Sequence, residues 1–376
     1  MKINIIGGGP AGLYFGILMQ QQDPSHEIQI YERDGPNDTY GWGIVFSSQT
    51  FSYLLEADPP SHGEFTRACQ TWDEVMVHFK GETNQVRGNR FSGIARLRFL
   101  NILQARCREL GIEPNFRHNV EDLAEVRDCD LLVGADGANS AIRNAFSEGF
   151  QPRLQWGANK YIWLGTRHLL SGLNLIFERH PAGLFAAHGY RFDAQTSTFI
   201  VECVGDSFER SGLAEMSDAE TCTFLADIFK VHLGGSSLLS NGFVQWFNFL
   251  WVSNRKWWHE NVVLLGDALH TAHFSIGSGT KQALEDSIAL AAALQSESAL
   301  ETGLRAFQSR RKPLVDRLQD AAFESLKWFE NISQYSDLSP LEFTYRVMTR
   351  SGRIDRENLR LRDPQFVAAL ERVSGS

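Results

Sequence analysis

The sequence holds few cysteines, and those it has follow no pattern used for bridging or for metal binding. There are five in 376 residues, with no CxxC pair and no Cys/His spacing: Cys69, Cys107, Cys129, Cys203 and Cys222. An odd, scattered set is typical of reduced thiols and argues against a disulfide framework or a zinc site. We therefore predict a cytoplasmic protein without a metal centre.

Positive charge and long apolar runs are scarce as well. Lys and Arg number 36 against 45 Asp and Glu, a net charge of −9, whereas a nucleic-acid partner needs a clustered basic excess. No uninterrupted apolar run approaches the roughly 18 residues of a membrane span. The apolar stretch from Ile3 to Met19 is broken by glycines and a proline, unlike a signal peptide. The sequence predicts a globular protein with neither a nucleic-acid nor a membrane partner.

The chain opens on a pattern that predicts a βαβ unit. Apolar runs predict strands over Lys2–Ile6 and Glu27–Tyr31, and the segment between them predicts a helix over Ala11–Gln22. Two short apolar runs further on, Asp130–Val133 and Val262–Leu265, each end at Gly or Asp and predict more strands of the same parallel sheet. One nucleotide-binding fold is thus assembled from distant pieces of sequence.

A second sheet and a helical C-terminal region are expected from the rest of the chain. Aromatic and β-branched runs separated by turn residues predict antiparallel strands over Tyr161–Leu164, Leu173–Phe177, Leu184–Phe192 and Thr198–Val201. After Gly279 the apolar spacing becomes helical, first over Gln282–Leu294, then over Thr302–Trp328, and less regularly toward Arg362.

A glycine-rich turn follows the first strand and points to a dinucleotide. Its motif is Gly7-Gly8-Gly9-Pro10-Ala11-Gly12, a G-x-G-x-x-G set between a strand and a helix. Gly7 permits the tight turn, Gly9 lets the backbone approach a pyrophosphate, and Gly12 lets helix and strand pack closely. The free N–H groups of the helix start favour that anion. Glu32, next to Arg33, ends the following strand and can accept hydrogen bonds from a ribose.

Two further turns decide which dinucleotide is bound. They are Gly134-Ala135-Asp136-Gly137-Ala138-Asn139-Ser140 with Arg143, and Gly266-Asp267-Ala268-Leu269-His270 followed by Gly277-Ser278-Gly279. With the first motif they resemble the three fingerprints of the flavin-dependent aromatic hydroxylases, which have a para-hydroxybenzoate hydroxylase-like fold. The resemblance spans nearly the whole chain. It implies an α/β protein with a Rossmann-like FAD-binding domain, an inserted antiparallel β-sheet substrate domain and C-terminal helices.

The same resemblance implies domain boundaries. The FAD-binding domain would comprise residues 1–72, 91–152 and 259–296, the substrate domain residues 73–90 and 153–258, and the C-terminal helical region residues 297–376.

Roles for individual residues around the cofactor also follow from the resemblance. In that family the residue matching Asp267 binds the ribityl and pyrophosphate region of tightly but non-covalently bound FAD. Asp136 and Gly137 match a turn that serves FAD and the pyridine nucleotide, and Arg96 matches an arginine that touches the FAD phosphates. A helix starting near Gly277, Ser278 and Gly279 would aim its N–H groups at the flavin pyrimidine ring, where reduction deposits negative charge.

The co-substrates follow from the motifs that the chain has and lacks. There is no second strand-associated G-x-G-x-x-G, so NADH or NADPH is expected as a transient co-substrate without a domain of its own. O2 is expected as the other co-substrate. The family's chemistry implies a single-component monooxygenase that works through an FAD C4a-hydroperoxide.

Finer resemblances concern the substrate. Gly41–Phe46, Lys160–Thr166, Ser197–Glu202 and His273–Lys281 are similar to the branch of the family with salicylyl-CoA 5-hydroxylases, the monooxygenase half of anthraniloyl-CoA monooxygenases and a violacein-pathway hydroxylase. Because the sequence ends at Ser376, no appended reductase domain is expected. The preferred hypothesis is hydroxylation of an aromatic acyl-CoA, salicylyl-CoA to gentisyl-CoA. The alternatives are 2-aminobenzoyl-CoA, a free aromatic or indole substrate, or an FAD-binding electron-transfer protein without oxygenase activity.

Candidate catalytic and substrate-binding residues come from the same segments. A thioester withdraws charge from the ring, so a base that takes the phenol proton would help, and His188, His273 or Tyr161 could serve. Trp42, Tyr190 and Phe274 are candidates for contact with the ring. For each of these residues a packing role in the core is an open alternative.

The CoA phosphates would need a basic patch on this acidic protein. Arginines cluster near the C-terminus at Arg346, Arg350, Arg353, Arg356, Arg360 and Arg362. Acidic residues interleave with them, so a solvated helix face is the favoured interpretation, and Arg255 and Lys256 are open to either account. The oligomeric state is left open, with a homodimer as one option.

Overall fold

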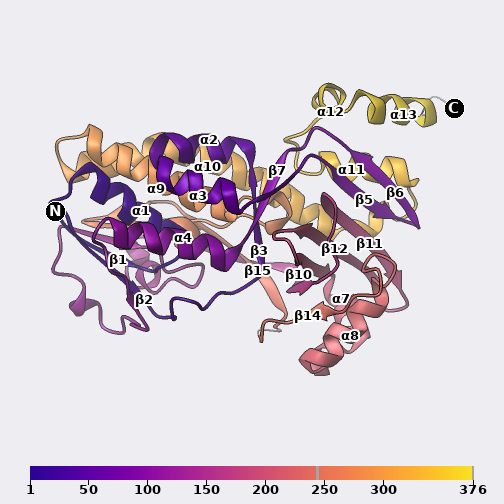
Figure 1. Cartoon of the computed structure of the whole chain (residues 1–376), viewed down its shortest axis with the longest axis horizontal. Coiled ribbons are helices and arrows are strands. Elements are labelled where there is room, and N and C mark those ends of the chain that lie inside the picture. Colours follow the sequence, from indigo (N-terminus) through magenta and orange to yellow (C-terminus); the bar gives the residue numbers. More distant parts are fainter. Residues whose placement is uncertain (243–244, 375–376) are drawn as a thin grey trace.

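The protein is elongated, with two large sheets side by side along its length. The computed structural model describes residues 1–242 and 245–374. Figure 1 shows a helix-covered parallel sheet at the N-terminal side and a larger, mainly antiparallel sheet at the other side. The C-terminal helices lie over the outer part of the larger sheet (Figure 1). This is the mixed α/β architecture that the sequence predicts.

The first sheet has six strands in the order β16-β17-β9-β1-β2-β8. Their bounds are β1 Lys2–Ile6, β2 Glu27–Glu32, β8 Asn115–Phe116, β9 Leu131–Gly134, β16 Trp258–His259 and β17 Val262–Leu264. All neighbours are parallel except β16 and β17. The predicted strands and their parallel pairing are confirmed, because strands buried on both faces read as short, fully apolar runs.

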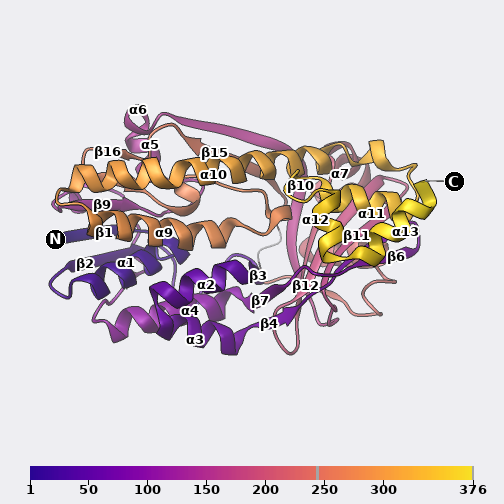
Figure 2. The same ribbon diagram turned by 90° about the horizontal axis from the view of Figure 1, so that it is seen from above.

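Helices cover this sheet. Helix α1 (Pro10–Gln22) lies between the sheet and α9 (Gly279–Ser296), and α9 packs in turn against α10 (Leu300–Glu330). Helix α4 (Arg96–Glu109) packs against α1 as well. Seen from above, α10 extends from the six-stranded sheet toward the larger one (Figure 2). A single helix of 31 residues therefore contributes to both halves of the molecule.

The larger sheet has the order β14-β10-β13-β12-β11-β5-β6, and β15 also pairs with β10. Its strands are β5 Val75–Phe79, β6 Glu82–Val86, β10 Pro152–Thr166, β11 Leu173–His180, β12 Gly183–Arg191, β13 Ser197–Cys203, β14 Leu238–Leu239 and β15 Phe247–Asn254. The four predicted antiparallel strands correspond to β10, β11, β12 and β13. Strands β5 and β6 come from the segment 73–90, which was expected to join this sheet, while the domain boundaries themselves stay a prediction.

A third, three-stranded sheet was not predicted. It consists of β3 (Gly43–Ser47), β7 (Phe91–Ala95) and β4 (Gln70–Trp72), with β7 in the middle. In Figure 1, β3 and β7 lie between the two larger sheets. Strand β7 leads directly into α4, so this small sheet positions Arg96 at the start of that helix.

The remaining helices complete the cover of the two sheets. They are α2 Ser48–Ala57, α3 Pro59–Ala68, α5 Ala141–Ala145, α6 Ser147–Phe150, α7 Gly205–Ser211, α8 Asp218–Ile228, α11 Pro340–Thr349, α12 Arg356–Arg362 and α13 Pro364–Ser374.

A buried set of charges joins α9 to α10. The Asp286 carboxylate lies 2.8 Å from His270 Nε2 and accepts a hydrogen bond of 2.9 Å from Arg311 Nε. Arg311 also contacts Glu285 at 3.0 Å and donates to Gln282 at 2.7 Å. Burial alone would raise the pKa of Asp286, but His270 and Arg311 hold it below its ordinary value. The third glycine–aspartate turn, which contains His270, is thereby fixed to both helices.

Candidate functional site

The three predicted turns meet at one edge of the six-stranded sheet. They follow β1, β9 and β17, which are parallel neighbours, so their carboxyl ends open on the same side. Backbone hydrogen bonds join consecutive strands here, from Ala135 N to Ile6 O at 2.7 Å and from Leu265 N to Gly134 O at 2.9 Å. Ligands of open α/β sheets bind at such carboxyl edges.

The glycines of the first turn are required by close backbone packing. Gly7 has φ +112°, and a Cβ on it would lie 2.2 Å from Ala135 O. A Cβ on Gly12 would lie 2.0 Å from Gly7 O, whereas a Cβ on Gly9 would meet nothing within 4 Å. Gly9 thus faces open space, as an approaching phosphate needs. Helix α1 starts at Pro10 without a side-chain cap, which leaves N–H groups free for that anion.

Glu32 is fixed beside this turn. Its Oε2 accepts a hydrogen bond of 2.6 Å from Gly8 N, and its Oε1 accepts one of 2.9 Å from Asp34 N. A carboxylate has about four acceptor sites, so two remain for ribose hydroxyls. Arg33 is exposed and forms an ion pair of 3.7 Å with Asp34.

Arg96 and Asp267 lie close enough for the charge of each to affect the pKa of the other. Asp267 is exposed, yet enough protein surrounds it that desolvation raises its pKa, and the charge of Arg96 opposes that shift. Desolvation likewise lowers the pKa of Arg96, opposed by Asp267. Arg96 Nε is buried without a hydrogen-bond partner among the described residues. A guanidinium and a carboxylate in the same region fit a phosphate and a polyhydroxy chain, respectively.

The second turn is tied to the third. Asp136 Oδ2 accepts hydrogen bonds from Ala141 N (2.7 Å) and Ile142 N (3.2 Å), at the start of α5. Gly137 has φ +83° and borders open space. Buried Arg143 donates to Ala268 O at 3.1 Å and to Ala138 O at 2.7 Å. Arg143 was noted in the sequence only as part of the motif, and its role in linking two turns depends on the fold.

The last predicted turn lies at the start of α9. Gly277 has φ +60°, and α9 begins at Gly279, in agreement with the predicted helix start. Ser278 Oγ donates to Ile276 O at 3.1 Å and does not cap the helix. The first N–H groups of α9 are therefore left without a side-chain partner.

A small cavity of about 10 Å³ lies where the larger sheet meets α10 and the segment before α9. That volume holds about one water molecule, so an aromatic ring enters only if side chains move. The lining residues are Gly157, Asn159, Tyr161, Glu202, Phe249, His273, Phe274, Leu326 and Glu330. Three of the sequence candidates, Tyr161, His273 and Phe274, meet here.

Glu202 is the residue of this cavity that sequence reasoning missed as a candidate. It lies on β13 directly opposite Tyr161 of β10, and two residue pairs along from His188 of β12. Its Oε1 accepts a hydrogen bond of 2.9 Å from Asn159 Nδ2, and its Oε2 lies 3.1 Å from His188 Nε2. Burial alone would raise the pKa of Glu202, but these partners and His273 hold it below its ordinary value. The carboxylate is therefore ionised at neutral pH.

The other candidates of the cavity are neutral near pH 7. Burial lowers the pKa of His273 to about 4 and raises the pKa of Tyr161 to about 12. His273 Nδ1 lies 2.7 Å from Ser275 Oγ. The Phe274 ring contacts Tyr161 and His188, with centroid distances of 4.8 and 5.3 Å.

Trp42 and Tyr190 do not line this cavity. Tyr190 is buried, donates its hydroxyl to Gly43 O at 2.7 Å and stacks on Trp72. Trp42 lies against Gly165, where an added Cβ would approach its indole to 2.7 Å. Both contacts fit the packing roles that the sequence left open, and contact of either side chain with a substrate stays a prediction.

Comparison with known proteins now identifies the family. Residues 86–322 match a family model described as an FAD binding domain. Over its whole length the chain is 39% identical to a salicyloyl-CoA 5-hydroxylase of Streptomyces sp., of which it covers 74%. The chain belongs to the FAD-dependent aromatic monooxygenases.

Two other similarities support this assignment. A 3-hydroxy-4-methyl-anthranilyl-[aryl-carrier protein] 5-monooxygenase of Streptosporangium sibiricum is 34% identical, with 96% of this chain and 97% of the relative covered. The solved structure of 2-methyl-3-hydroxypyridine-5-carboxylic acid oxygenase shares the fold with a TM-score of 0.74 at 18% identity, covering 96% of this chain and 97% of that one.

FAD is the cofactor of this monooxygenase, and the turns at the sheet edge fit it. Open space beside Gly9 and Gly137, the unpaired Arg96 Nε and the uncapped start of α9 are the features that the pyrophosphate and the ring of a flavin require. When bound, FAD supplies the redox centre that accepts a hydride from NAD(P)H and activates O2. The assignment of each residue to a part of FAD stays a prediction.

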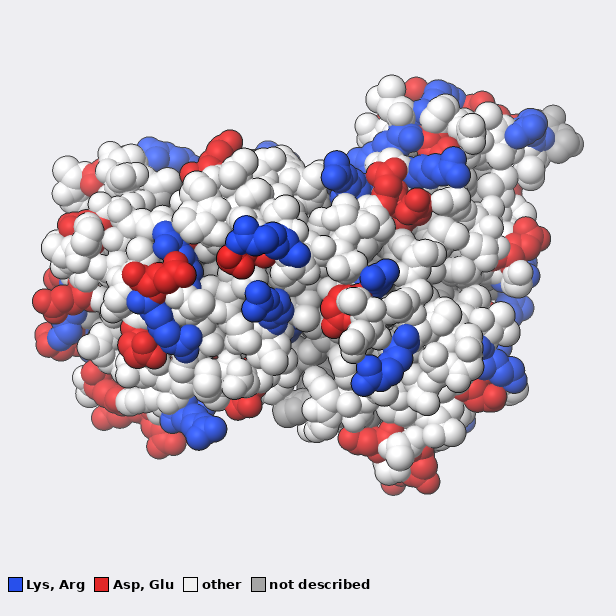
Figure 3. Space-filling view, in the orientation of Figure 1, with Lys and Arg blue, Asp and Glu red and all other residues white. Residues whose placement is uncertain are grey.

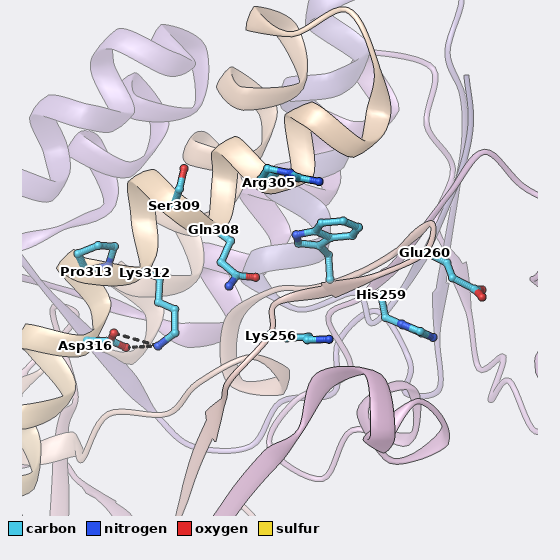
Figure 4. A pocket seen from close by; sticks show the side chains of 10 residues that line it. Lys256, His259, Glu260, Arg305, Gln308, Ser309, Lys312, Pro313 and Asp316 are labelled. Atoms are coloured by element: carbon cyan, nitrogen blue, oxygen red, sulfur yellow. Dashed lines mark hydrogen bonds and ion pairs between the residues drawn. The ribbon is translucent and has the colours of Figure 1, made fainter.

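A larger groove, of about 610 Å³, lies elsewhere on the monooxygenase. Figure 4 shows residues from α10, including Arg305, Lys312 and Asp316, facing Lys256 and His259 from the segment around β16. Arg305 pairs with Glu301, and Lys312 pairs with Asp316. Of the residues singled out in the sequence only Lys256 lines this groove.

The arginine cluster near the C-terminus is largely paired. Arg360 bonds to Glu357 and Glu371, Arg356 bonds to Glu371, and Arg362 donates to Asn89 at 2.9 Å. Figure 3 shows acidic and basic side chains interleaved over the region where α12 and α13 lie in Figure 1. These contacts favour a solvated, ion-paired face over a patch for CoA phosphates.

Two negative findings concern the described part of the chain. Within residues 1–242 and 245–374 no group of three or more His, Cys, Asp and Glu side chains is placed to hold a metal ion. No helix within those residues is both long and apolar enough to cross a bilayer.

The depressed pKa of His273 predicts a pH-dependent stability. An unfolded histidine titrates near 6.5, whereas folded His273 stays neutral down to about 4. Between these values the unfolded chain binds a proton that the folded chain does not, so stability is full above about pH 6.5 and falls on acidification. Wild-type protein should lose about 2 kcal/mol more between pH 7 and pH 5 than His273→Gln. Urea unfolding at both pH values measures this, and equal losses in the two proteins would contradict it.

Proposed function

We propose that this monooxygenase hydroxylates an aromatic acyl group carried as a CoA thioester, with salicylyl-CoA to gentisyl-CoA as the preferred reaction. Two relatives support the substrate class. One is named for salicyloyl-CoA and the other for an anthranilyl group on an aryl-carrier protein. Both names describe a benzoyl group with a neighbouring hydroxyl or amino substituent, attached to a carrier.

The observation that carries the proposal is the buried, ionised Glu202 in a cavity beside the flavin turn. His273 and Phe274 line this cavity and lie only a few residues before Gly277–Gly279, so the cavity adjoins the expected flavin ring position. An electron-donating hydroxyl makes the ring carbon para to it reactive toward an electrophilic oxygen. A buried anion next to the hydroxyl would strengthen that donation by accepting its proton in a hydrogen bond.

The remaining residues take supporting roles in this proposal. Gly7, Gly9, Pro10, Ala11 and Gly12 would hold the pyrophosphate with Arg96, and Glu32 would hold a ribose. Asp136, Gly137, Asp267 and the start of α9 would hold the rest of FAD. Neutral His273 and Tyr161 can donate hydrogen bonds into the cavity, and Phe274 would contact the ring. We propose that the protein acts in the cytoplasm, where its five unbridged cysteines stay reduced.

The second candidate substrate is a 2-aminobenzoyl thioester. The anthranilyl group in the name of the Streptosporangium relative favours it, because an aromatic amine can replace the hydroxyl as donor both of electrons and of a hydrogen bond.

A substrate panel tests the proposal. NAD(P)H oxidation by the yellow, FAD-loaded protein should rise at least about tenfold with salicylyl-CoA, with one hydroxylated product per reductant. The corresponding free acids serve as matched controls and should have little effect, because they lack the carrier. If salicylyl-CoA and 2-aminobenzoyl-CoA leave the rate unchanged while a free phenol or indole raises it, the thioester assignment is wrong. If NAD(P)H is consumed at the same rate with every compound, an electron-transfer role replaces it.

A further inference from the structure

We propose that the cavity recognises two adjacent substituents of the ring, with Glu202 accepting a hydrogen bond from the ortho hydroxyl or amino group and His273 donating one from Nε2 to the thioester carbonyl. This inference rests on the proposed function and adds the reason why the two groups must be neighbours on the ring. It concerns recognition of the substrate by side chains of this chain alone.

The acceptor half follows from how Glu202 is held. The side chain is 2% exposed, and Asn159 and His188 each occupy one of its oxygens from the sheet side. An ionised carboxylate has only acceptor sites, and about two of its four are left. Since Glu202 lines the cavity, a free site can meet a ligand there. A hydroxyl or amine fits this position, whereas a carbonyl or carboxylate oxygen would be repelled.

The donor half follows from a chain of hydrogen bonds that starts at Arg350. A guanidinium can only donate, so Arg350 Nε donates to Ser325 Oγ, at 2.9 Å. Ser325 is fully buried, and Ser275 Oγ, at 2.7 Å, is the one hydrogen-bond acceptor that its hydroxyl contacts among the described residues. To avoid a buried hydroxyl without an acceptor, Ser325 must donate to Ser275.

The direction of this chain assigns the tautomer of His273. Because Ser275 Oγ accepts from Ser325, its own proton is directed to His273 Nδ1, at 2.7 Å. Nδ1 is then the acceptor of the imidazole, and the proton of the neutral ring sits on Nε2. No described residue hydrogen-bonds to Nε2, and His273 lines the cavity. His273 is thereby a hydrogen-bond donor toward the cavity and not a base.

The two halves together form a recognition pattern. Once side chains move to admit a ring, an acceptor and a donor that line one cavity are complementary to a ring with a donor group next to an acyl oxygen. A benzoyl thioester without the hydroxyl leaves Glu202 unpaired. A 4-hydroxybenzoyl thioester places its hydroxyl too far from the carbonyl to use both residues. Leaving a buried polar group unpaired is what gives such sites their selectivity.

Binding to the FAD-loaded enzyme tests the acceptor. The change of the flavin absorption spectrum on titration gives dissociation constants for 2-hydroxybenzoyl-CoA, 4-hydroxybenzoyl-CoA and benzoyl-CoA. Wild type should prefer the 2-hydroxy compound by at least about tenfold, and Glu202→Gln should lose this preference while keeping its flavin and its affinity for benzoyl-CoA. An unchanged preference in Glu202→Gln overturns the assignment of Glu202. If none of the three thioesters binds to wild type, it is the proposed function that fails, and the recognition pattern falls with it.

Nitrogen-15 NMR of histidine-labelled enzyme tests the donor without any substrate. The His273 signals, assigned by their loss in His273→Gln, should show a protonated Nε2 and an unprotonated Nδ1. Ser325→Ala should disturb this tautomer and weaken thioester binding, whereas Ser309→Ala, an exposed serine of the same helix, should change neither. A protonated Nδ1 in wild type would overturn the donor assignment.

Discussion

Asp267→Ala is expected to yield largely flavin-free protein. We place the Asp267 carboxylate at the ribityl chain, where it would accept hydrogen bonds from hydroxyl groups near the Arg96 guanidinium. Loss of a hydrogen bond to a charged group costs about 1.5–3 kcal/mol, which corresponds to FAD binding weakened by about 10- to 150-fold. The ratio of flavin absorbance to protein absorbance after purification, followed by titration with FAD, measures the loss.

Two variants control this experiment. Asp267→Asn keeps one acceptor oxygen and should retain an intermediate FAD content. Asp128→Ala removes an exposed carboxylate that pairs with Lys2 at the surface and should keep the wild-type content. Normal FAD content in Asp267→Ala would remove our placement of the ribityl chain at this turn.

Asp286→Ala should lower the free energy of unfolding by about 3–5 kcal/mol. The substitution leaves His270 without its anion and Arg311 with only Glu285 and Gln282 as partners, all in the interior between α9 and α10. Removing one partner of a buried ion pair is costly because the remaining charge stays desolvated. Urea unfolding followed by circular dichroism, with FAD held at a fixed excess, gives the difference.

The matched control for this variant is on the neighbouring helix. Asp316→Ala breaks a partly exposed pair with Lys312, four residues earlier on α10, and should change stability by less than about 1 kcal/mol. Equal effects of the two substitutions would show that the buried network contributes no more than a surface pair.

Much of the parallel sheet could be predicted from the sequence, and the reason is burial on both faces. Strand β1 was predicted with its observed bounds, and β9 and β17 were within one residue. Strands such as these read as short apolar runs that end in glycine or aspartate. Helices α9 and α10 could also be predicted, because their apolar spacing is regular over many turns.

Strands that form only by pairing with a distant segment could not be predicted from the sequence. The three-residue strand β4 exists because it pairs with β7, about twenty residues later. Strand β10 begins at Pro152, well before the predicted Tyr161, because the largely exposed residues at its start pair with β15. Neither segment is a continuous apolar run of the kind that marks a buried strand, so neither is evident without its partner.

In the candidate site, too, some features could be predicted from the sequence and others depend on the fold. The glycine–aspartate turns were found from spacing alone, since backbone geometry imposes the residue type. Glu202 carried one signal, a charged residue directly after the apolar run Phe199–Val201, but its meaning depends on β12 and β10 lying on either side. The link from Arg350 through Ser325 and Ser275 joins three distant segments, and only the folded chain brings them together.

The path of the chain has a consequence for dissection of the molecule. The chain leaves the parallel sheet to form β5 and β6 of the larger sheet, and then returns to form α4 and β9. It crosses to the larger sheet again for β10 to β15 and returns for β17, after which α10 leads toward the larger sheet once more. No single cut therefore separates the two sheets. Limited proteolysis should give nicked protein that stays associated, and a transplant of the larger sheet from a relative would need several junctions joined at once.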